Sequence, residues 1–492
     1  MDPILYWNNV ALEANRRDFS NEPGKDKPSP EQGGPTLSSR ALAVVHLAMY
    51  DAHAGVVSSA ALPRYRAAPP NPAAGASAAA AVAAAAHACL SALFPRQKPH
   101  FDAAHLAAGL SGAGLAEGHD FGLAVAQAML ADRKDDPSAS DNGYATSMHP
   151  SGHRPDPANP TQGYHAPFYG ARSKCFAVTP QPGPVRHELD APPAYGGAEY
   201  VKALKQVRGK GIAPELMGTL PTTFSKRTVD ETLVGLYWAY DGPRELGTPP
   251  RQYNQIVREV AMTVVNPSIG GINTVDENAR LFAFVNAAMG DAGILAWDQK
   301  YIHDLWRPVV GIREHDASMG PVAPTPTHNI DNDCDPTWLP LGSPASNSSD
   351  RNFTPPFPAY PSGHATFGAT AFHIVRLFYG VAAGNRAADT VYTGPFVSDE
   401  LNGVTRDNAG NVRPRHARRF PRGLWQMIEE NGFSRVFLGV HWSFDAFALD
   451  AAGKPDLTRN VGGVPLGLKI AEDIFAAGAG RAPVKSVVGP RA

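Results

Sequence analysis

The chain has 492 residues, a formal net charge of −2 and 43% hydrophobic residues. This length and apolar content are enough to bury a sizeable core in about two to four domains or in one large fold. The near-neutral charge gives no reason to expect nucleic acid or a membrane surface as a partner. With 47 glycines and 46 prolines, we expect a globular protein with long ordered loops.

Three cysteines, Cys89, Cys175 and Cys334, are too few and too scattered for a disulfide framework or a zinc site, so we expect free thiols. Residues 1–9 have no basic region, long apolar core or cleavage signal. This predicts a cytoplasmic location by default and leaves export by another route open. The alanine-rich residues 73–94 indicate a packed helix rather than a membrane span.

The spacing of apolar residues in the first half predicts helices over residues 6–16, 40–52, 73–94 and 115–133. Ser38 and Ser39 are expected to cap the second of these helices. No alternating strand pattern of useful length occurs. Residues 138–193, rich in Pro, Gly, Asn and His, predict a long surface loop and the boundary between two helical halves.

The second half opens with helices predicted over residues 228–240 and 253–265. Thr274 and Glu277 have the spacing of a capping box, which begins a long helical pattern that ends before Pro308. Lys300 and Arg307 are seven residues apart near its end, so we expect them to project from one helix face. A solvated basic face would explain them, but the neighbouring aromatic residues favour a partly buried pair, which requires an anion.

Four prolines within residues 355–361 hold the chain extended before another helical pattern. Ser362 is the expected N-cap of this helix, with Gly363 and His364 in its first turn. The free N–H groups there form a site for anions, with which the histidine can exchange protons. Taken alone, the stretch is better explained as a capped helix after a proline-rich loop. The long loop before it, residues 309–354, is typical of the border of a functional site.

A third cluster follows a helix predicted over residues 424–430, which Gly432 is expected to end. Arg435 comes next, and His441 begins a further helical stretch with Asp445 at i+4. That spacing lets the carboxylate orient the imidazole, as a ligating histidine requires. A pair of this kind taken alone is more often a surface contact.

The three clusters occur in a fixed order, as Lys300-x6-Arg307-Pro308, Pro361-Ser362-Gly363-His364 and Ser434-Arg435-x5-His441-x3-Asp445. Together they resemble the signature of the superfamily that contains type-2 phosphatidic acid phosphatases, bacterial class A acid phosphatases and vanadium-dependent haloperoxidases. The strings that resemble the vanadium chloroperoxidase branch are residues 6–9, 39–42, 355–365, 437–442 and 462–468. The resemblance therefore spans almost the whole chain.

This resemblance implies an all-α fold of two four-helix bundles with long connecting loops and a vanadate site in the second bundle. We accordingly expect an N-terminal helical bundle with its loop region over residues 1–220. A catalytic helical bundle that carries the vanadate site is expected over residues 221–492.

The resemblance also implies roles for single residues. His441 matches the covalent ligand of a vanadate cofactor. The positions that match its other anion-binding groups are Lys300, Arg307, Arg435, Ser362 and Gly363. His364 matches the acid–base histidine, Lys300 would polarise hydrogen peroxide, and Asp241 matches a carboxylate that braces Arg435.

Phe357 and Trp297 match aromatic residues of the chloroperoxidase branch, whereas bromide-preferring relatives carry more polar residues there. Aromatic walls would keep the pocket dry, strengthen its electrostatic contacts and leave His364 without a competing side-chain partner. The implied reaction is the oxidation of chloride, bromide or iodide by hydrogen peroxide to hypohalous acid. A small organic acceptor is a further expected partner.

Two other functions remain open from the sequence. A soluble acid phosphatase would use the same residues, with His441 as nucleophile and His364 as general acid. A protein that binds phosphate or vanadate without catalysis would need only the cations. Halide-dependent turnover of hydrogen peroxide with added vanadate separates the three functions.

Overall fold

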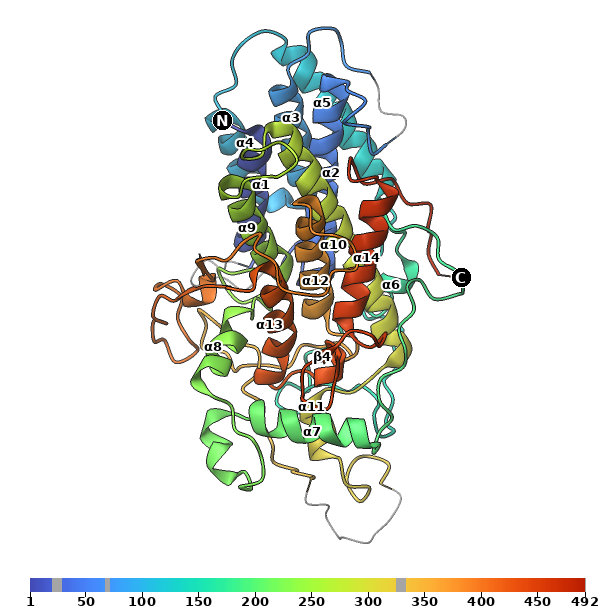
Figure 1. The fold of residues 1–492 in the computed structure, drawn as a ribbon, viewed down its shortest axis with the longest axis vertical. Coiled ribbons are helices and arrows are strands. Elements are labelled where there is room, and N and C mark those ends of the chain that lie inside the picture. Colours follow the sequence, from blue (N-terminus) through green and yellow to red (C-terminus); the bar gives the residue numbers. More distant parts are fainter. Residues whose placement is uncertain (20–28, 67–70, 324–332, 492) are drawn as a thin grey trace.

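Long α-helices dominate the computed structural model, which describes residues 1–492 except 20–28, 67–70, 324–332 and 492 (Figure 1). The helices are α1 (Pro3–Asp18), α2 (Gly34–Val57), α3 (Ala78–Leu93), α4 (Lys98–Ala107), α5 (Leu115–Asp132), α6 (Tyr169–Arg172), α7 (Ala198–Lys210), α8 (Val229–Tyr237), α9 (Pro249–Thr263), α10 (Val275–His303), α11 (Pro308–Arg313), α12 (Gly363–Phe378), α13 (Gly423–Phe437) and α14 (Gly463–Ala477). Short 3-10 helices are η1 (Pro95–Gln97), η2 (Pro214–Thr219), η3 (Asp399–Leu401) and η4 (Ser443–Asp445).

The described strands have two residues each and form two small antiparallel sheets. In the first, β1 (Phe396–Val397) pairs with β2 (Ala417–Arg418), and in the second, β3 (Ala448–Leu449) pairs with β4 (Pro455–Asp456). The all-α fold expected from the sequence is therefore confirmed.

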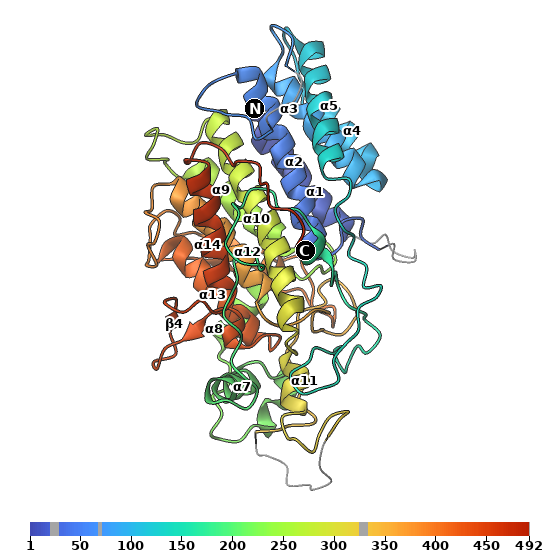
Figure 2. The same cartoon turned by 90° about the vertical axis from the view of Figure 1, so that its right-hand side faces the viewer.

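Two helical bundles share the central helix α10. Helices α2, α3 and α5 pack together with α1 and α4, and helices α9, α12, α13 and α14 form the second group. Helix α10 packs along α2 on one side and along α12 and α14 on the other (Figure 2). Because buried apolar side chains of both bundles form one continuous core, the expected division at residue 220 stays a prediction.

Helix α10 is apolar because most of it is buried inside the protein. By length and composition this helix could cross a membrane, but 94% of its most apolar window is buried inside the protein. Such burial is typical of the central helix of a packed core. The three cysteines are also buried, and they are free, as expected.

Several predicted helix ends differ in the structure. Helix α2 begins at Gly34 rather than at residue 40, because Pro35 has the fixed φ that suits a first helical turn. Ser38 and Ser39 therefore lie inside α2, where their hydroxyls donate to backbone carbonyls, and the expected cap is wrong. Thr274 does begin α10, but without the side-chain-to-backbone bonds of a capping box.

Gly432 does not end a helix. Helix α13 continues through it to Phe437, because the missing side chain lets other residues approach closely. A Cβ atom at Gly432 would lie 2.7 Å from the ring of Phe447 and 3.2 Å from the Cβ of Ala446. The glycine thus serves packing between elements rather than termination.

The region 138–193 is largely irregular, as predicted, but much of it is not a surface loop. Phe176, Ala177 and Val178 are buried, and their backbone N–H groups donate to the carboxylate of Asp291 on α10 at 2.5, 2.7 and 2.8 Å. One carboxylate thereby satisfies the amides that a buried loop would otherwise leave unpaired.

We predict that Asp291→Ala lowers the free energy of unfolding by roughly 3 kcal/mol or more, because it leaves three buried N–H groups without an acceptor. The shift in the urea midpoint measures this loss. Asp102→Ala, at an exposed carboxylate, should stay within about 0.5 kcal/mol of the wild type. Equal stability of the two variants would show that Asp291 does not anchor the loop.

Candidate active site

Arg307 lies at a sharp turn after α10 rather than on its helical face. The helix ends at His303, and Asp304 adopts a left-handed conformation with φ 46°, which redirects the chain before α11. The expectation that Lys300 and Arg307 share one helix face is therefore wrong. Arg307 is nevertheless buried, with 1% of its surface exposed.

The guanidinium of Arg307 is only partly hydrogen-bonded. Its Nε donates to the carbonyl oxygen of Phe357 at 2.8 Å. Its Nη1 lies 2.8 Å from the carbonyl oxygen of Val440 and 2.8 Å from Nε2 of His441. Its Nη2 is buried without a partner among the described residues. One charged donor beside His441 is thus left for an acceptor that the protein does not supply.

Arg435, in the last turn of α13, has two further donors of this kind. Its Nη2 donates to Oδ2 of Asp241 at 2.8 Å and to the hydroxyl of Ser343 at 3.3 Å. Its Nε and Nη1 are buried and have no partner within the described part of the chain. Burial alone would raise the pKa of Asp241, but the charge of Arg435, the neighbouring His364 and the hydrogen bonds from Ser343 and Arg435 together outweigh burial and lower that pKa. The predicted contact between Asp241 and Arg435 is present.

Lys300 is bound by backbone rather than by an anion. Its Nζ donates to the carbonyl oxygens of Pro358, Ala359 and Pro361 at 2.8, 3.1 and 2.6 Å. Burial and the nearby charge of Arg307 lower the pKa of Lys300, while the three acceptors favour its charged form. The ammonium needs no anion to satisfy it, in contrast to the sequence-based expectation.

The His441 imidazole is oriented by Asp445, as predicted. Its Nδ1 lies 2.7 Å from Oδ2 of Asp445, which also accepts the N–H of Trp442 at 2.9 Å. Asp445 belongs to the short helix η4 rather than to a long helical stretch. Burial and the charge of Arg307 lower the pKa of His441, so the ring is neutral. With Nδ1–H donating to Asp445, Nε2 retains the lone pair that a ligand atom requires.

The proline-rich stretch leads into α12 as predicted. Ser362 is its N-cap, with the hydroxyl 3.4 Å from the backbone nitrogen of Ala365, and Gly363 begins the helix. A Cβ atom at Gly363 would meet the ring of Trp297 at 3.2 Å, so a side chain there would crowd this wall.

His364 is neutral, and its tautomer is set by a carbonyl group. Its Nε2 lies 3.1 Å from the carbonyl oxygen of Ala239, which can only accept. Nε2 therefore carries the hydrogen, and Nδ1 is the basic nitrogen. Burial and the charge of Arg435 lower the pKa of His364 to about 3. Oδ1 of Asp241 lies 3.8 Å from Nε2, so the expectation that His364 has no neighbouring side-chain partner is wrong.

These groups meet around a cavity of about 130 Å³. Its wall includes Asp241, Gly363, His364, Arg435 and His441, together with Trp297, Phe357, Phe353, Phe367, Gly34, Pro35, Pro249, Pro355, Pro356 and His165. The rings of Trp297 and Phe357 lie 4.7 Å apart, as neighbouring wall groups should. Lys300, Arg307 and Ser362 lie close behind this wall rather than in it.

Among the titratable residues in this cavity wall, His165 is the one that the sequence did not reveal. It comes from the region 138–193, and nothing in its local sequence resembles a motif. Only the burial of that region against α10 brings the ring to the cavity, and burial of an irregular segment has no periodic signal.

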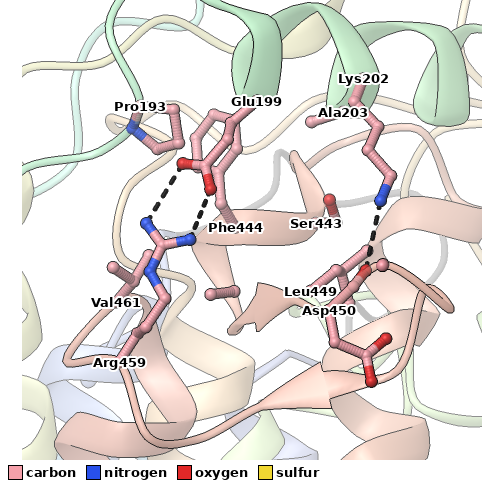
Figure 3. A pocket seen from close by; sticks show the side chains of 12 residues that line it. Pro193, Glu199, Lys202, Ala203, Ser443, Phe444, Leu449, Asp450, Arg459 and Val461 are labelled. Carbon is pink, nitrogen blue, oxygen red and sulfur yellow. Dashed lines mark hydrogen bonds and ion pairs between the residues drawn. The ribbon is translucent and has the colours of Figure 1, made fainter.

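A second hollow of about 140 Å³ lies against η4 (Figure 3). An ion pair between Glu199 and Arg459 borders it, and Lys202 donates to the carbonyl oxygen of Asp450 at 3.2 Å. It shares no residue with the first cavity and contains no histidine. Of these two cavities, only the first has in its wall an arginine with buried nitrogens that lack a partner among the described residues.

Comparison with known proteins identifies the family. "Vanadium chloroperoxidase N-terminal domain" matches residues 1–175, and "VCPO second helical-bundle domain" matches residues 280–459. The vanadium chloroperoxidase of Curvularia inaequalis is 35% identical over 580 aligned positions, which cover 96% of this chain and 89% of that protein. The chain belongs to the vanadium chloroperoxidase family.

Similar solved structures confirm the helical fold. A bacterial vanadium-dependent iodoperoxidase matches with a TM-score of 0.61 at 16% identity, covering 96% of both chains. A holo-type bacterial vanadium-dependent chloroperoxidase matches with a TM-score of 0.59 at 16% identity, covering 94% of this chain and 96% of that one. At such low identity these two likenesses concern the fold alone.

We predict that phosphate, sulfate and vanadate each raise the melting temperature, because each supplies acceptors to the unpartnered guanidinium donors. At an anion concentration of 100 times Kd, the free energy of unfolding should rise by about 2.7 kcal/mol. Arg435→Ala should lose most of this response in thermal scans, whereas Arg422→Ala, at an exposed arginine, should keep it. An equal response in both variants would place the anion elsewhere.

Proposed function

We propose that this chain is a vanadium-dependent haloperoxidase that oxidises halide with hydrogen peroxide to hypohalous acid. The observation that carries the proposal is the set of buried guanidinium nitrogens of Arg307 and Arg435 that have no partner among the described residues and lie beside the neutral His441. Membership of the vanadium chloroperoxidase family supports it.

The residues present fit vanadate as the cofactor. Vanadate is a phosphate-like oxyanion, and guanidinium groups suit its oxygens. His441 would hold it through Nε2, while Arg307 Nη2 and Arg435 Nε and Nη1 would donate to its oxygens. When bound, vanadate supplies a Lewis acid that activates hydrogen peroxide toward halide without a change in its own oxidation state.

His364 is suited to move protons in this cavity. Its neutral imidazole has the free lone pair at Nδ1, so it can accept a proton from hydrogen peroxide and return it to the leaving oxygen. Asp241 lies near its other nitrogen and would stabilise the imidazolium that forms.

The positive charge of Lys300 would stabilise the negative charge that develops on the leaving oxygen of hydrogen peroxide. Its Nζ lies 5.1 Å from the ring centre of Phe357 and 5.5 Å from that of Trp297. Three carbonyl acceptors hold it in place, so it can act without reorganisation. Its direct contact with hydrogen peroxide stays a prediction.

We predict that His441→Ala abolishes vanadate retention after dialysis and halide-dependent halogenation of a diketone dye, with unchanged circular dichroism. The reason is that Nε2 of His441 is the proposed covalent link, while the core helices do not depend on it. His87→Ala, on the N-terminal bundle, should retain both properties. A dialysed His441→Ala protein with wild-type turnover would refute the ligand assignment.

The proposed halide range is chloride, bromide and iodide, with chloride oxidised at mildly acid pH. Trp297 and Phe357 support this proposal, because an aromatic wall excludes water and strengthens the charges that act on hydrogen peroxide.

We predict that Phe357→His lowers kcat/KM for chloride relative to bromide, since it places a polar ring in that wall. Measuring both halides in wild type and variant tests this expectation. Phe378→His, at a position outside the cavity wall, is the matched control and should leave the ratio unchanged. A ratio that Phe357→His also leaves unchanged would show that this ring does not set halide preference.

A further inference from the structure

His165 brings a titratable ring into a cavity wall that is otherwise largely aromatic and proline-rich. Its ring centre lies 6.0 Å from that of Trp297, edge to face, and 6.1 Å from that of Phe357. Neither the proposed reaction nor the family motifs use it. The ring thus adds a hydrogen-bonding group beside Phe357 and Trp297, from which the sequence predicted an aromatic wall.

Only one nitrogen of this imidazole is occupied by the protein. Nε2 lies 2.9 Å from the hydroxyl of Thr36, and Nδ1 has no hydrogen-bond partner among the described residues. Nδ1 is also not among the polar atoms sealed off in the interior. Burial lowers the pKa of His165 to about 4, so the ring is neutral near pH 6 and carries one N–H.

The hydrogen bond between the Thr36 hydroxyl and Nε2 allows the imidazole to carry its hydrogen on Nδ1, the nitrogen that the protein leaves without a partner among the described residues. A hydroxyl can donate or accept. When Thr36 donates to Nε2, the hydrogen of the imidazole sits on Nδ1 and is free to bind an anion. An anion near Nδ1 would therefore select this tautomer at no cost in hydrogen bonds.

The position of the ring is fixed by three other segments. The backbone nitrogen of His165 donates to the carbonyl oxygen of Pro356 at 2.8 Å. Its own carbonyl accepts from Trp297 Nε1 at 3.2 Å and from the Tyr301 hydroxyl at 2.7 Å. Gly34 has φ +69°, and a Cβ atom there would lie 2.4 Å from the imidazole. A group held this firmly can determine where a small ligand sits.

We propose that His165 positions the halide, with its Nδ1–H donating to the anion in the aromatic wall. This proposal rests on the proposed function. A neutral N–H and the electropositive edges of aromatic rings hold a halide less tightly than a buried arginine would. The halide thus stays nucleophilic toward the activated oxidant, and the guanidinium groups remain available to the oxyanion.

Steady-state kinetics of the vanadate-loaded enzyme test the role. His165→Phe keeps a ring and removes the donor, so KM for bromide should rise about tenfold, the effect of one hydrogen bond to an ion. The kcat and the KM for hydrogen peroxide should change less than twofold. His119→Phe, at an exposed histidine on α5, is the matched control and should match wild type.

Variants of Thr36 separate a donor role from simple packing. Thr36→Ser keeps the hydroxyl and should leave KM for bromide near the wild-type value. Thr36→Val removes the hydroxyl while keeping the shape, so Nε2 loses the donor that the Nδ1–H tautomer needs, and KM for bromide should rise several-fold. Equal values for the two variants, or an unchanged KM for bromide in His165→Phe, would overturn the proposal.

A crystallographic measurement tests the halide-positioning role of His165 independently of the proposed halide oxidation. Crystals of the vanadate-free protein soaked in bromide should show anomalous density beside Nδ1 of His165, which His165→Phe should lose. Bromide density there in an enzyme that oxidises no halide would refute the function but support the assignment of His165. Density elsewhere only, or density that persists in His165→Phe, would refute that assignment.

Discussion

Two buried guanidinium groups impose the main physical constraint on this fold. Arg307 and Arg435 are each 1% exposed, and moving such a charge out of water costs several kcal/mol. Asp241 and a few backbone carbonyls offset part of that cost, yet three guanidinium nitrogens keep no acceptor in the described protein. An oxyanion between these donors would complete the electrostatics, so the cavity is built for an anion before any catalysis is considered.

The other structural features of the site bring these two guanidinium groups together and place His441 beside them. Asp304 turns the chain so that Arg307 enters the second bundle, and Gly432 lets α13 run on until Arg435 reaches the same cavity. Asp445 fixes the tautomer of His441, so that Nε2 keeps its lone pair beside Nη1 of Arg307. Lys300 holds the proline-rich stretch by its carbonyls. The contacts of Lys300 and Arg435 join segments that are far apart in the sequence, so the site depends on both the helices and the irregular connections.

The helical class could be predicted because apolar spacing is a local signal, whereas the ten expected site residues came mainly from the resemblance of three sequence clusters to a known family. Apolar spacing marks α12, a serine marks its cap, and the i+4 spacing of His441 and Asp445 fixes their contact. Features that depend on tertiary contacts could not be predicted in this way. The burial of region 138–193 depends on Asp291, the extension of α13 depends on packing against Gly432, and His165 reaches the cavity only as a result of such packing.

The most direct test of this account is a crystal structure of the vanadate-soaked protein. We expect electron density for the oxyanion at bonding distance from Nε2 of His441, with Arg307 Nη2 and Arg435 Nε and Nη1 donating to its oxygens. Vanadate bound elsewhere, or bound while those three nitrogens stay unpartnered, would contradict the central claim that the buried guanidinium groups and His441 together form the cofactor site.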